Sequence, residues 1–393
     1  MRAELPFLDL TAPGFSTRGP EVLAARDAHW CARTPSGLAV LRHREAGLLL
    51  RDRRLRQGSF AWPERQGLTG PFAEFWTRSI IAEEGPRHKA LRRIARAALS
   101  DPFVEALIPD FETAAARLVD PLPPRFDMIE AVSEPFAGQA ICLILGLPPE
   151  EARALSKNAS ALGLAMGPDG KRYEARFNRA TEDLMTLAET LILRAEAGED
   201  RESFVARLLA AAHELDLSDR QTLKDLIVIS IFGGVDTTRA QLGFATALFI
   251  EHPAQWAALR AAPELVPQAI DEVIRTWPTT TWSTRWAVEG FSFGGVDIAA
   301  GDTLHILVHS SGRDPRVCPD EAFDVRRRVK GHFGFGGGAH SCLGQTLART
   351  DMAAALRVLL SRWSAIRSDG TPEYHPDSGN TSPKRLPIAV TRA

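Results

Sequence analysis

One uninterrupted helical pattern constrains the fold of this chain more than any other feature. It begins at Ser218, which can cap a helix N-terminus, and continues to about Glu251, where Pro253 ends it because proline cannot donate the next backbone hydrogen bond. At about 1.5 Å per residue, these roughly 33 residues span about 50 Å. A helix of this length crosses an entire domain, which is unusual in a soluble protein.

Most of the remaining chain also has helical patterns, and strand patterns are fewer. We predict an early strand at 37–42 and further strands within 279–288 and 291–308, where apolar and polar residues alternate. No internal repeat, low-complexity tract or long flexible linker interrupts the chain. The predicted fold class is therefore mainly α with a minor β region, in a single domain of residues 1–393. Further helices are predicted at about 43–53, 86–99, 103–119, 129–145, 149–162, 173–197, 263–277 and 342–363.

Three segments are predicted to be irregular. Residues 59–77 contain several large aromatic side chains among Pro and Gly residues, which predicts a loop with an apolar face. The connection 163–172 contains three glycines and Pro168, and we expect it to be mobile. Residues 310–339 are rich in Arg, Asp, Pro and Gly and have no regular period.

Composition excludes several classes of protein. The chain has 47 Lys and Arg against 49 Asp and Glu, so a global attraction to nucleic acid or to a membrane has no support. The most apolar stretch, Leu226 to Val235, is too short to cross a bilayer, and the N-terminus lacks the apolar core of a signal peptide. The four cysteines form no Cys-x-x-Cys pair, and we expect them to be reduced thiols. We therefore expect a soluble, cytoplasmic protein that binds neither nucleic acid nor membrane.

The ten residues before the last predicted helix carry the most chemical information. They read Phe335-Gly336-Gly337-Gly338-Ala339-His340-Ser341-Cys342-Leu343-Gly344. Consecutive glycines allow backbone torsions closed to other residues and let the chain lie close to a flat ligand. We expect Cys342 to lie at the start of the helix, where the helix dipole and free N–H groups favour a thiolate that could hold an iron.

Two other interpretations of this segment remain open on the residues alone. Cys342 can be a small buried hydrophobic residue, which is the commonest role of a free cysteine. The stretch Gly334 to Ala339 also matches the dinucleotide fingerprint G-x-G-x-x-A. Against the second interpretation, the residues before it, Arg326 to Gly331, do not form the buried strand that this fingerprint requires.

The same ten residues fit the haem-binding signature F-G-x-G-x-H-x-C-x-G of the cytochrome P-450 family at every fixed position. The chain therefore resembles that family. The resemblance implies that Cys342 is the axial thiolate ligand of a haem b iron, that His340 contacts a haem propionate, and that Phe335 packs near the sulfur. It also implies that glycines of the motif shape the loop and bind the cofactor: Gly336, Gly338 and Gly344.

The middle of the long helix reads Gly233-Gly234-Val235-Asp236-Thr237-Thr238. Two adjacent glycines there cost about 1–2 kcal/mol relative to alanine, which indicates that another group needs room beside the backbone. A helix break capped again by Asp236 is the alternative. The segment resembles the oxygen-activation motif of the P-450 family. By that resemblance, Asp236 and Thr237 form the acid–alcohol pair that delivers protons for O–O cleavage, and Gly234, with Gly233, borders the oxygen-binding groove.

Glu272 and Arg275 lie three residues apart on one predicted helix. Such a pair is commonly a solvated salt bridge that contributes a few tenths of a kcal/mol. It also matches the E-x-x-R motif of the P-450 family at a suitable distance before the cysteine loop. The resemblance implies that both side chains join an arginine of the irregular segment, which we expect to be Arg327, in a structural and not a catalytic role.

His88 and Arg92 lie one helical turn apart in a basic stretch. The pair can be an exposed basic face, or it can bind a dianion. It resembles the H-x-x-x-R helix of the family, in which both residues contact the haem propionates. Arg285 follows Ser283 and Thr284 where many members have a third propionate contact. The resemblance covers the whole chain, because these motifs follow one another in the family's order.

By this resemblance the chain is a haem-thiolate monooxygenase that activates O2 to oxidise a small hydrophobic organic substrate. The segments expected around its substrate are 60–76, 163–172, 229–234, 279–283 and 379–383. The chain contains no flavin, nicotinamide or iron–sulfur segment, so electrons are expected from a separate ferredoxin or flavodoxin with its NAD(P)H-dependent reductase. A basic docking patch could be formed by Arg87, Lys89, Arg93, Arg96 and the run from Arg326 to Lys330. The alternative function is a haem-binding sensor or sequestering protein without turnover.

Overall fold

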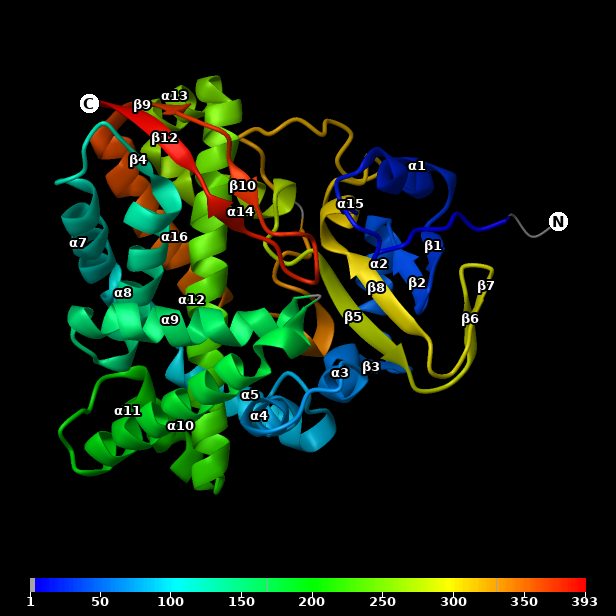
Figure 1. Cartoon of the computed structure of the whole chain (residues 1–393), viewed down its shortest axis with the longest axis horizontal. Coiled ribbons are helices and arrows are strands. Elements are labelled where there is room, and N and C mark those ends of the chain that lie inside the picture. Colours follow the sequence, from blue (N-terminus) through cyan, green and yellow to red (C-terminus); the bar gives the residue numbers. More distant parts are fainter. Residues whose placement is uncertain (1–3, 168, 330) are drawn as a thin grey trace.

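The computed structural model describes residues 4–167, 169–329 and 331–393. Figure 1 shows two parts: helices gathered around α12 (Arg220–Glu251) on one side, and a sheet with α1 (Pro20–Ala28) and α2 (His43–Leu49) on the other. Two earlier predictions concern residues outside the described ones, namely Pro168 in the connection 163–172 and Lys330 in the basic run. None of the described helices combines the length and the apolar composition that a bilayer span requires.

The long helix α12 is 32 residues long and lies in the centre of the helical part. Its N-cap is Asp219, not Ser218 as predicted, because the Asp219 carboxylate accepts the Thr222 N–H at 2.9 Å. The helix ends at Glu251, with His252 as its C-cap before Pro253, as predicted. The helices that pack against α12 include α8 (Glu134–Leu145), α9 (Ala152–Gly163), α10 (Glu174–Glu196), α14 (Val266–Thr276) and α16 (Gln345–Arg362).

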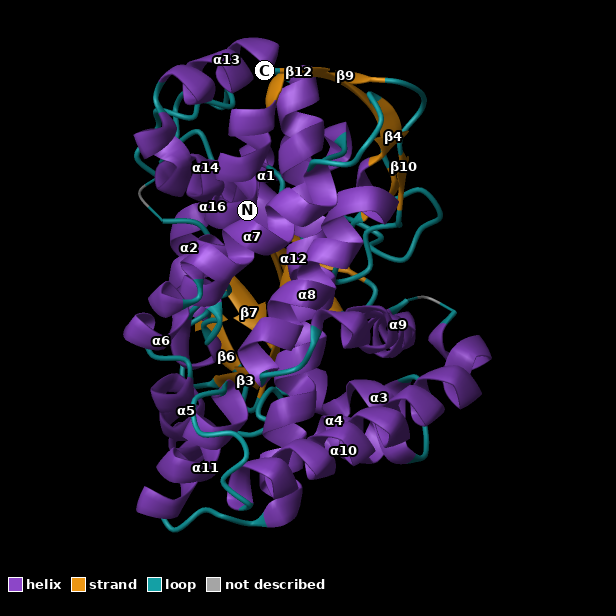
Figure 2. Ribbon diagram, turned by 90° about the vertical axis from the view of Figure 1, so that its left-hand side faces the viewer, coloured by secondary structure: helices purple, strands orange, loops and turns teal. Residues whose placement is uncertain are grey.

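Most of the other helices lie around the outside of the helical part (Figure 2), whereas α15 lies beside α2 and the sheet (Figure 1). Helix α5 covers Gly85–Ala98, close to the prediction of 86–99. The predicted helix 103–119 is divided near Leu107 because Pro109 starts a new helix. Helices α11 and α13 were not predicted. The remaining helical bounds are α3 (Trp62–Arg65), α4 (Pro71–Arg78), α6 (Asp101–Ala106), α7 (Ile108–Val119), α11 (Phe204–Glu214), α13 (Pro253–Ala261) and α15 (Val308–Gly312), with short 3-10 or π turns at 58–61, 129–133, 149–151, 164–166, 170–173, 263–265 and 338–340.

The prediction of a loop at 59–77 is wrong. Helices α3 and α4 occupy most of this segment, with Pro71 at the first turn of α4. Phe72, Phe75 and Trp76 lie at helical spacing and are fully buried in the main core. Their burial against Phe177 and Phe232 explains why the apolar residues are needed there.

The main sheet has five strands in the order β1-β2-β8-β5-β3. Strands β2 and β8 are parallel, and the other neighbours are antiparallel. Arg285 on β5 pairs with Leu304 on β8, which fixes the face on which Arg285 lies. The strand bounds are β1 (Cys31–Thr34), β2 (Gly37–Val40), β3 (Leu55–Gln57), β5 (Trp282–Ala287) and β8 (Thr303–Leu307).

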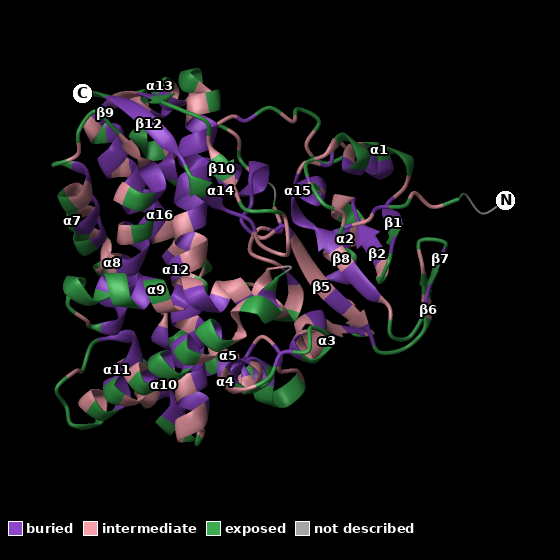
Figure 3. Cartoon of the chain, viewed as in Figure 1, coloured by how far each residue is buried: buried purple, intermediate pink, exposed green. Residues whose placement is uncertain are grey.

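Smaller sheets complete the fold. Strands β4 (Arg125–Asp127), β12 (Pro387–Arg392) and β9 (Trp363–Ser368) form one sheet; β6 (Phe291–Phe293) pairs with β7 (Val296–Ile298), and β10 (Glu373–Tyr374) pairs with β11 (Pro383–Arg385). The strands after residue 363 were not predicted. Figure 3 shows that burial is concentrated in α12, α16 and the main sheet, whereas the outer helices present exposed faces. The site described next lies between these buried elements.

Candidate functional site

A cavity of about 380 Å³ lies beside the middle of α12. The cysteine loop and α16 form another part of its wall. Residues of α12 that line it are Ile229, Ser230, Ile231, Gly233, Gly234, Thr237, Thr238 and Gln241. The loop and α16 contribute Gly334, Phe335, Gly336, His340, Ser341, Cys342, Leu343, Gly344, Leu347, Ala348, Asp351 and Met352. The structure therefore brings the two most informative sequence motifs to one cavity.

The cysteine loop needs its glycines for close packing. Gly338 has φ 70°, and a Cβ placed there would lie 2.1 Å from the Leu50 carbonyl oxygen. Gly336 also has a positive φ of 65°. The Cys342 N–H donates to the Phe335 carbonyl at 2.8 Å, which closes the loop. The Cys342 side chain is accessible within the cavity, and not buried as a core hydrophobic residue would be.

The prediction that Cys342 starts a helix is wrong, and without a bound metal the protein does not favour the Cys342 thiolate. Helix α16 begins at Gln345, three residues later. Although Cys342 is accessible within the cavity, the protein around it desolvates the thiol and raises its pKa, while the Gly344 N–H and the charges of Arg92 and Arg349 lower it. A bound metal cation would reverse this balance, since coordination deprotonates a thiol. A cavity-facing sulfur with this donor set fits an iron ligand.

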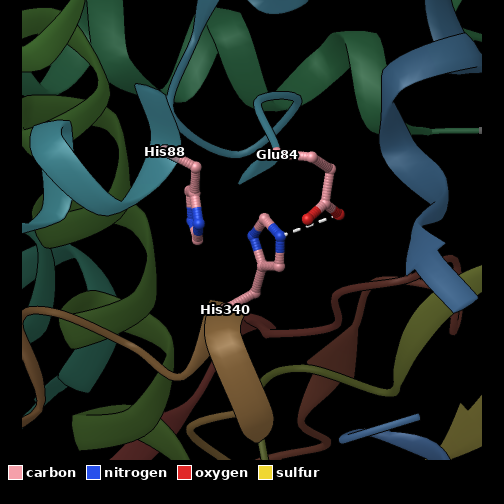
Figure 4. Close-up of side chains that lie close together, drawn as sticks. All are labelled: Glu84, His88 and His340. Atoms are coloured by element: carbon pink, nitrogen blue, oxygen red, sulfur yellow. Dashed lines mark hydrogen bonds and ion pairs between the residues drawn. The ribbon is translucent and has the colours of Figure 1, made fainter. Parts of the chain in front are cut away.

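His88, His340 and Glu84 form a cluster at the edge of this site (Figure 4). The rings of His88 and His340 stack with centroids 4.1 Å apart, and His340 Nε2 lies 3.0 Å from Glu84 Oε1. Burial raises the pKa of Glu84, but the His340 and Gln57 hydrogen bonds outweigh burial and bring the pKa to about 2. His340 therefore already binds one carboxylate, that of Glu84. The imidazole groups of this cluster are also suited to bind a carboxylate of a cofactor.

His88 is buried and has a nitrogen, Nε2, without a hydrogen-bond partner among the described residues. Burial and the neighbouring His340 and Arg92 lower the pKa of His88 to about 4. A buried polar atom without a partner is costly, so an anionic group from outside the chain would find a donor here. The ligand-binding alternative for His88 thus has geometric support, whereas an exposed basic face does not describe this residue.

Two arginines donate hydrogen bonds to backbone carbonyls of the cysteine loop. Arg92 Nη2 donates to the Ser341 carbonyl at 2.7 Å, and Arg285 Nη2 donates to the Gly337 carbonyl at 3.1 Å. Arg285 is 4% exposed, and burial lowers its pKa to about 10. The structure therefore places both predicted arginines at the loop that carries Cys342 and His340.

Asp236 and Thr237 differ in where their side chains lie. Thr237 lines the cavity, and its hydroxyl donates to the Gly233 carbonyl within α12. Asp236 lies outside the described lining of the cavity and pairs with Arg239, whose Nη2 is 2.7 Å from Asp236 Oδ1. The helix continues through this segment, so a helix break capped again by Asp236 is excluded.

The surroundings of the two glycines of this motif, Gly233 and Gly234, differ. A Cβ at Gly234 would lie 2.3 Å from Ile141 Cδ1, so this glycine allows α8 to pack closely against α12. A Cβ at Gly233 would meet nothing within 4 Å, and this residue borders the cavity. The expected space beside the helix backbone is confirmed at Gly233.

The predicted group of Glu272, Arg275 and Arg327 is confirmed. Arg275 Nε lies 2.7 Å from Glu272 Oε2, and Arg327 Nε lies 3.2 Å from Glu272 Oε1. Glu272 and Arg275 are almost fully buried, so this is not the solvated salt bridge of the simpler interpretation. Arg275 also donates to the Gly312 carbonyl, which ties α14 to the segment before the cysteine loop.

Two of the five predicted substrate segments line the cavity, 229–234 and 279–283. Segments 60–76, 163–172 and 379–383 do not contribute to the described lining. Other elements replace them with apolar side chains: Ile80, Ile81, Ile141, Ile144, Leu145 and Phe204. Because these positions come from the turn after α4 and from α8 and α11, only the tertiary fold brings them together.

Sequence reasoning missed three polar residues of this region. Glu84 caps the basic helix α5, and an acid directly before a basic run was the available signal. Gln241 lies four residues after Thr237, which places both on one helix face. Asp351 is the single acidic residue between 343 and 363, and it directly precedes an apolar run.

Comparisons with known proteins agree with this fold and site. The Cytochrome P-450 family model matches residues 165–386. Luteothin monooxygenase of Streptomyces thioluteus is 34% identical over 98% of this chain and 96% of its own length. Nocardicin C N-oxygenase of Nocardia uniformis is 32% identical over 98% of this chain and 97% of its own length. The crystal structure of CalO2 superposes with a TM-score of 0.88 and 25% identity, covering 95% of each chain.

The fold and the cysteine-lined cavity define a protein that binds haem through a thiolate. The chain belongs to the cytochrome P-450 family. It is a haem-thiolate monooxygenase, which uses O2 and a redox partner to oxidise a small organic substrate. The relatives named above are oxygenases, and they give no support to a haem-binding sensor without turnover.

Proposed function

We propose that Cys342 is the axial ligand of haem b in a cavity bounded by α12 and α16, within one domain formed by residues 1–393. The observation that supports this assignment most directly is the Cys342 side chain in the same cavity as Gly233 and Thr237. When bound, the haem supplies the binding and reductive activation of O2. The protein supplies ligation, orientation and protons.

His88, Arg92, His340 and Arg285 hold the haem carboxylates in this proposal. The Glu84 carboxylate beside His340 supports it, since the same ring N–H can donate to a propionate oxygen. Phe335, Gly336 and Gly344 line the cavity beside Cys342, so they contact the macrocycle and the sulfur. Gly234, in the glycine motif of α12, allows α8 and α12 to pack close together.

Asp236 and Thr237 would move protons into the cavity. The Thr237 hydroxyl holds a proton at the cavity wall, and the neighbouring Asp236 lies in a polar group with Arg239 and Ser382. A carboxylate can take up a proton from water and pass it to an adjacent hydroxyl. We therefore assign Asp236 to proton uptake and Thr237 to proton delivery.

The substrate is proposed to be an uncharged, mainly apolar organic molecule. Outside the two motifs, the apolar part of the cavity wall consists of Ile80, Ile81, Ile141, Ile144, Leu145 and Phe204, and none of these side chains can pair with a substrate charge. Relatives include a 6-deoxyerythronolide B hydroxylase of Saccharopolyspora erythraea, 28% identical over 78% of this chain. A bulky neutral natural product is therefore the substrate class to screen first.

Electrons are proposed to come from an acidic ferredoxin or flavodoxin with its NAD(P)H-dependent reductase. Arg93 and Arg96 are exposed on α5, the helix that also carries Arg92 beside the cysteine loop. A basic patch so close to the loop suits an acidic carrier. Arg93→Glu with Arg96→Glu should slow reduction and weaken its salt dependence. An unchanged rate at every salt concentration would contradict this docking patch.

Turnover is the test of the proposed activity. We expect a bound substrate to change the haem absorption spectrum and to increase NAD(P)H consumption by the enzyme with a surrogate ferredoxin and reductase. Oxygenated product should carry one atom from 18O2. Haem binding without oxygenation of any neutral substrate in a broad screen would contradict the proposed substrate class.

A further inference from the structure

We propose that a hollow between α1 and α15 is a second ligand site, which binds the carboxylate or phosphate group of a small anionic metabolite. It would bind this ligand independently of haem and of the monooxygenase reaction, because it shares no lining residue with the cavity beside α12. The hollow has a volume of about 360 Å³. Small-molecule sites have volumes of about 300–1,000 Å³, so a small metabolite fits. The lining includes Ser16, Arg18, Leu23, His309, Arg313 and Glu321.

The packing of α1 against α15 brings the cations of this hollow together. Arg18 precedes α1, Arg313 follows α15, and the two helices lie side by side (Figure 1). Arg26 of α1 is buried and connects the parts: its Nη1 donates to the Arg313 carbonyl at 2.8 Å, and its Nη2 donates to Glu321 Oε1 at 2.9 Å. The wall of the hollow is therefore fixed by hydrogen bonds before any ligand binds.

Two buried nitrogen atoms of the lining have no hydrogen-bond partner among the described residues. They are Nδ1 of His309, a residue that is 4% exposed, and Nε of Arg313. Buried polar atoms without a partner are costly and rare in folded proteins. A guanidinium nitrogen can only donate, so the missing partner of Arg313 Nε must be an acceptor atom.

Arg18 supplies a further donor at the same hollow. Its guanidinium lies 4.0 Å from the centroid of the Trp277 ring, which holds one face of the group. Within the part of the chain that the structure describes, no residue forms an ion pair or a hydrogen bond with this guanidinium. Asp377, the first acid to act on its charge, instead accepts hydrogen bonds from the Thr17 N–H at 2.7 Å and the Thr17 hydroxyl at 2.8 Å. The donors of Arg18 are therefore open to a ligand.

The hollow is electropositive at His309. Burial lowers the pKa of this imidazole well below 6.5, and the charges of Arg313, Arg18 and Arg26 lower it further. The Glu321 carboxylate repels an anion only weakly, because it is shared between two of these cations. Its Oε1 lies 2.9 Å from Arg26 Nη2, and its Oε2 lies 3.6 Å from Arg313 Nη2. An added negative charge is therefore favoured in this hollow.

These donors define the chemistry of the ligand. Carboxylate and phosphate oxygens accept paired N–H bonds from guanidinium groups, and the bonds are strong because both partners are charged. The neutral imidazole of His309 can add one N–H donor. Leu23 offers an apolar contact to the carbon atoms of the metabolite. A small organic acid or a small organic phosphate matches this combination.

Titration calorimetry of the haem-loaded enzyme tests the site with inorganic phosphate and with succinate, at an ionic strength held constant with sodium chloride. At least one of these anions should bind saturably, with one equivalent per chain. Arg18→Gln should weaken this binding by at least about tenfold, because it removes a charged hydrogen-bond donor. Arg194→Gln removes a partly exposed arginine of α10 and should bind as the wild type does. No saturable binding of either anion, or equal affinity in Arg18→Gln and the wild type, would overturn the proposal.

Crystals of the haem-loaded enzyme soaked in tungstate locate the anion without any variant. Tungstate is a tetrahedral oxyanion like phosphate, and its anomalous signal should lie in the hollow, within hydrogen-bond distance of Arg313 Nε or His309 Nδ1. Phosphate should leave the haem absorption spectrum unchanged, because the hollow and the cavity of Cys342 share no lining residue. A tungsten peak only elsewhere on the molecule, or a haem spectrum that changes as phosphate binds, would overturn the proposal.

Discussion

Arg239 Nη2 lies 2.7 Å from Asp236 Oδ1, so the acid of the central motif is ion-paired while its neighbour Thr237 lines the cavity. Both partners are partly shielded from solvent, and the i, i+3 spacing places them on one helix face. Within this motif the acid, Asp236, is bound to Arg239, and the alcohol, Thr237, lines the cavity. In the proposed mechanism, proton delivery therefore depends on the hydroxyl of Thr237.

Thr237→Ala should uncouple electron consumption from product formation. The variant removes the hydroxyl at the cavity wall and leaves Cys342 untouched, so NAD(P)H oxidation should continue while product per NAD(P)H falls by about 10²-fold. The missing product should appear as hydrogen peroxide, measured by a peroxidase assay. Thr237→Ser retains the hydroxyl and is the matched control. Equal coupling in the alanine variant and the wild type would exclude Thr237 from proton delivery.

Glu272→Gln should strongly destabilise the protein. The change keeps the shape of the side chain but leaves Arg275 buried without its carboxylate, which costs about 3–5 kcal/mol of the free energy of unfolding. Denaturant unfolding measures this loss. Glu199→Gln removes an exposed carboxylate from a 3.9 Å pair with Arg194 and should have little effect. Similar stabilities of the two variants would contradict a structural role for the buried group.

Gly338→Ala should prevent stable haem incorporation. The new Cβ would lie 2.1 Å from the Leu50 carbonyl oxygen, so the cysteine loop must move away from α2. Gly67→Ala is the control, because Gly67 also has a positive φ of 62° but no atom within 4 Å of the new Cβ. It should cost only about 1 kcal/mol of backbone strain. The ratio of haem to protein absorbance after purification compares them, and equal ratios would contradict the steric argument.

His309 should make stability depend on pH in the acidic range. It is 4% exposed on α15, and burial lowers its pKa well below 6.5. The unfolded chain therefore binds a proton that the folded chain does not, and the free energy of unfolding falls as pH decreases below about 6.5. This residue alone contributes a slope of up to about 1.4 kcal/mol per pH unit. In His309→Gln the slope between pH 6 and 5 should be smaller by that amount, whereas parallel slopes would contradict a neutral buried imidazole.

The sequence predicts the central helix well, because an apolar run of this length and a terminal proline leave few alternatives. The start at Asp219 differs by one residue, since Ser218 and Asp219 are both good caps. The helix α4 was missed although Phe72, Phe75 and Trp76 have helical spacing, because the surrounding glycines and prolines indicate a loop. Strand β12 (Pro387–Arg392) pairs with β4 (Arg125–Asp127), which lies far away in the sequence, and such nonlocal pairing has no local signal.

Some features of the site can likewise be predicted from the sequence, and others cannot. The cysteine loop and the glycines of α12 are local motifs, so their resemblance to a family could be recognised from the residues. The ion pair between Asp236 and Arg239 lies within one helix and follows from spacing. In contrast, Glu84 reaches His340, and Asp351 reaches Thr238, across more than a hundred residues of sequence. Only the packing of α5 and α16 reveals these contacts.

The carbon monoxide difference spectrum of the dithionite-reduced protein tests thiolate ligation most directly. The wild type should show the strongly red-shifted Soret band of a thiolate-ligated haem, and Cys342→Ala should lose it. Cys318→Ala, at a partly exposed cysteine outside the cavity lining, should keep the band. A spectrum typical of histidine ligation in the wild type, or a red-shifted band that survives in Cys342→Ala, would contradict the assignment of Cys342 as the iron ligand.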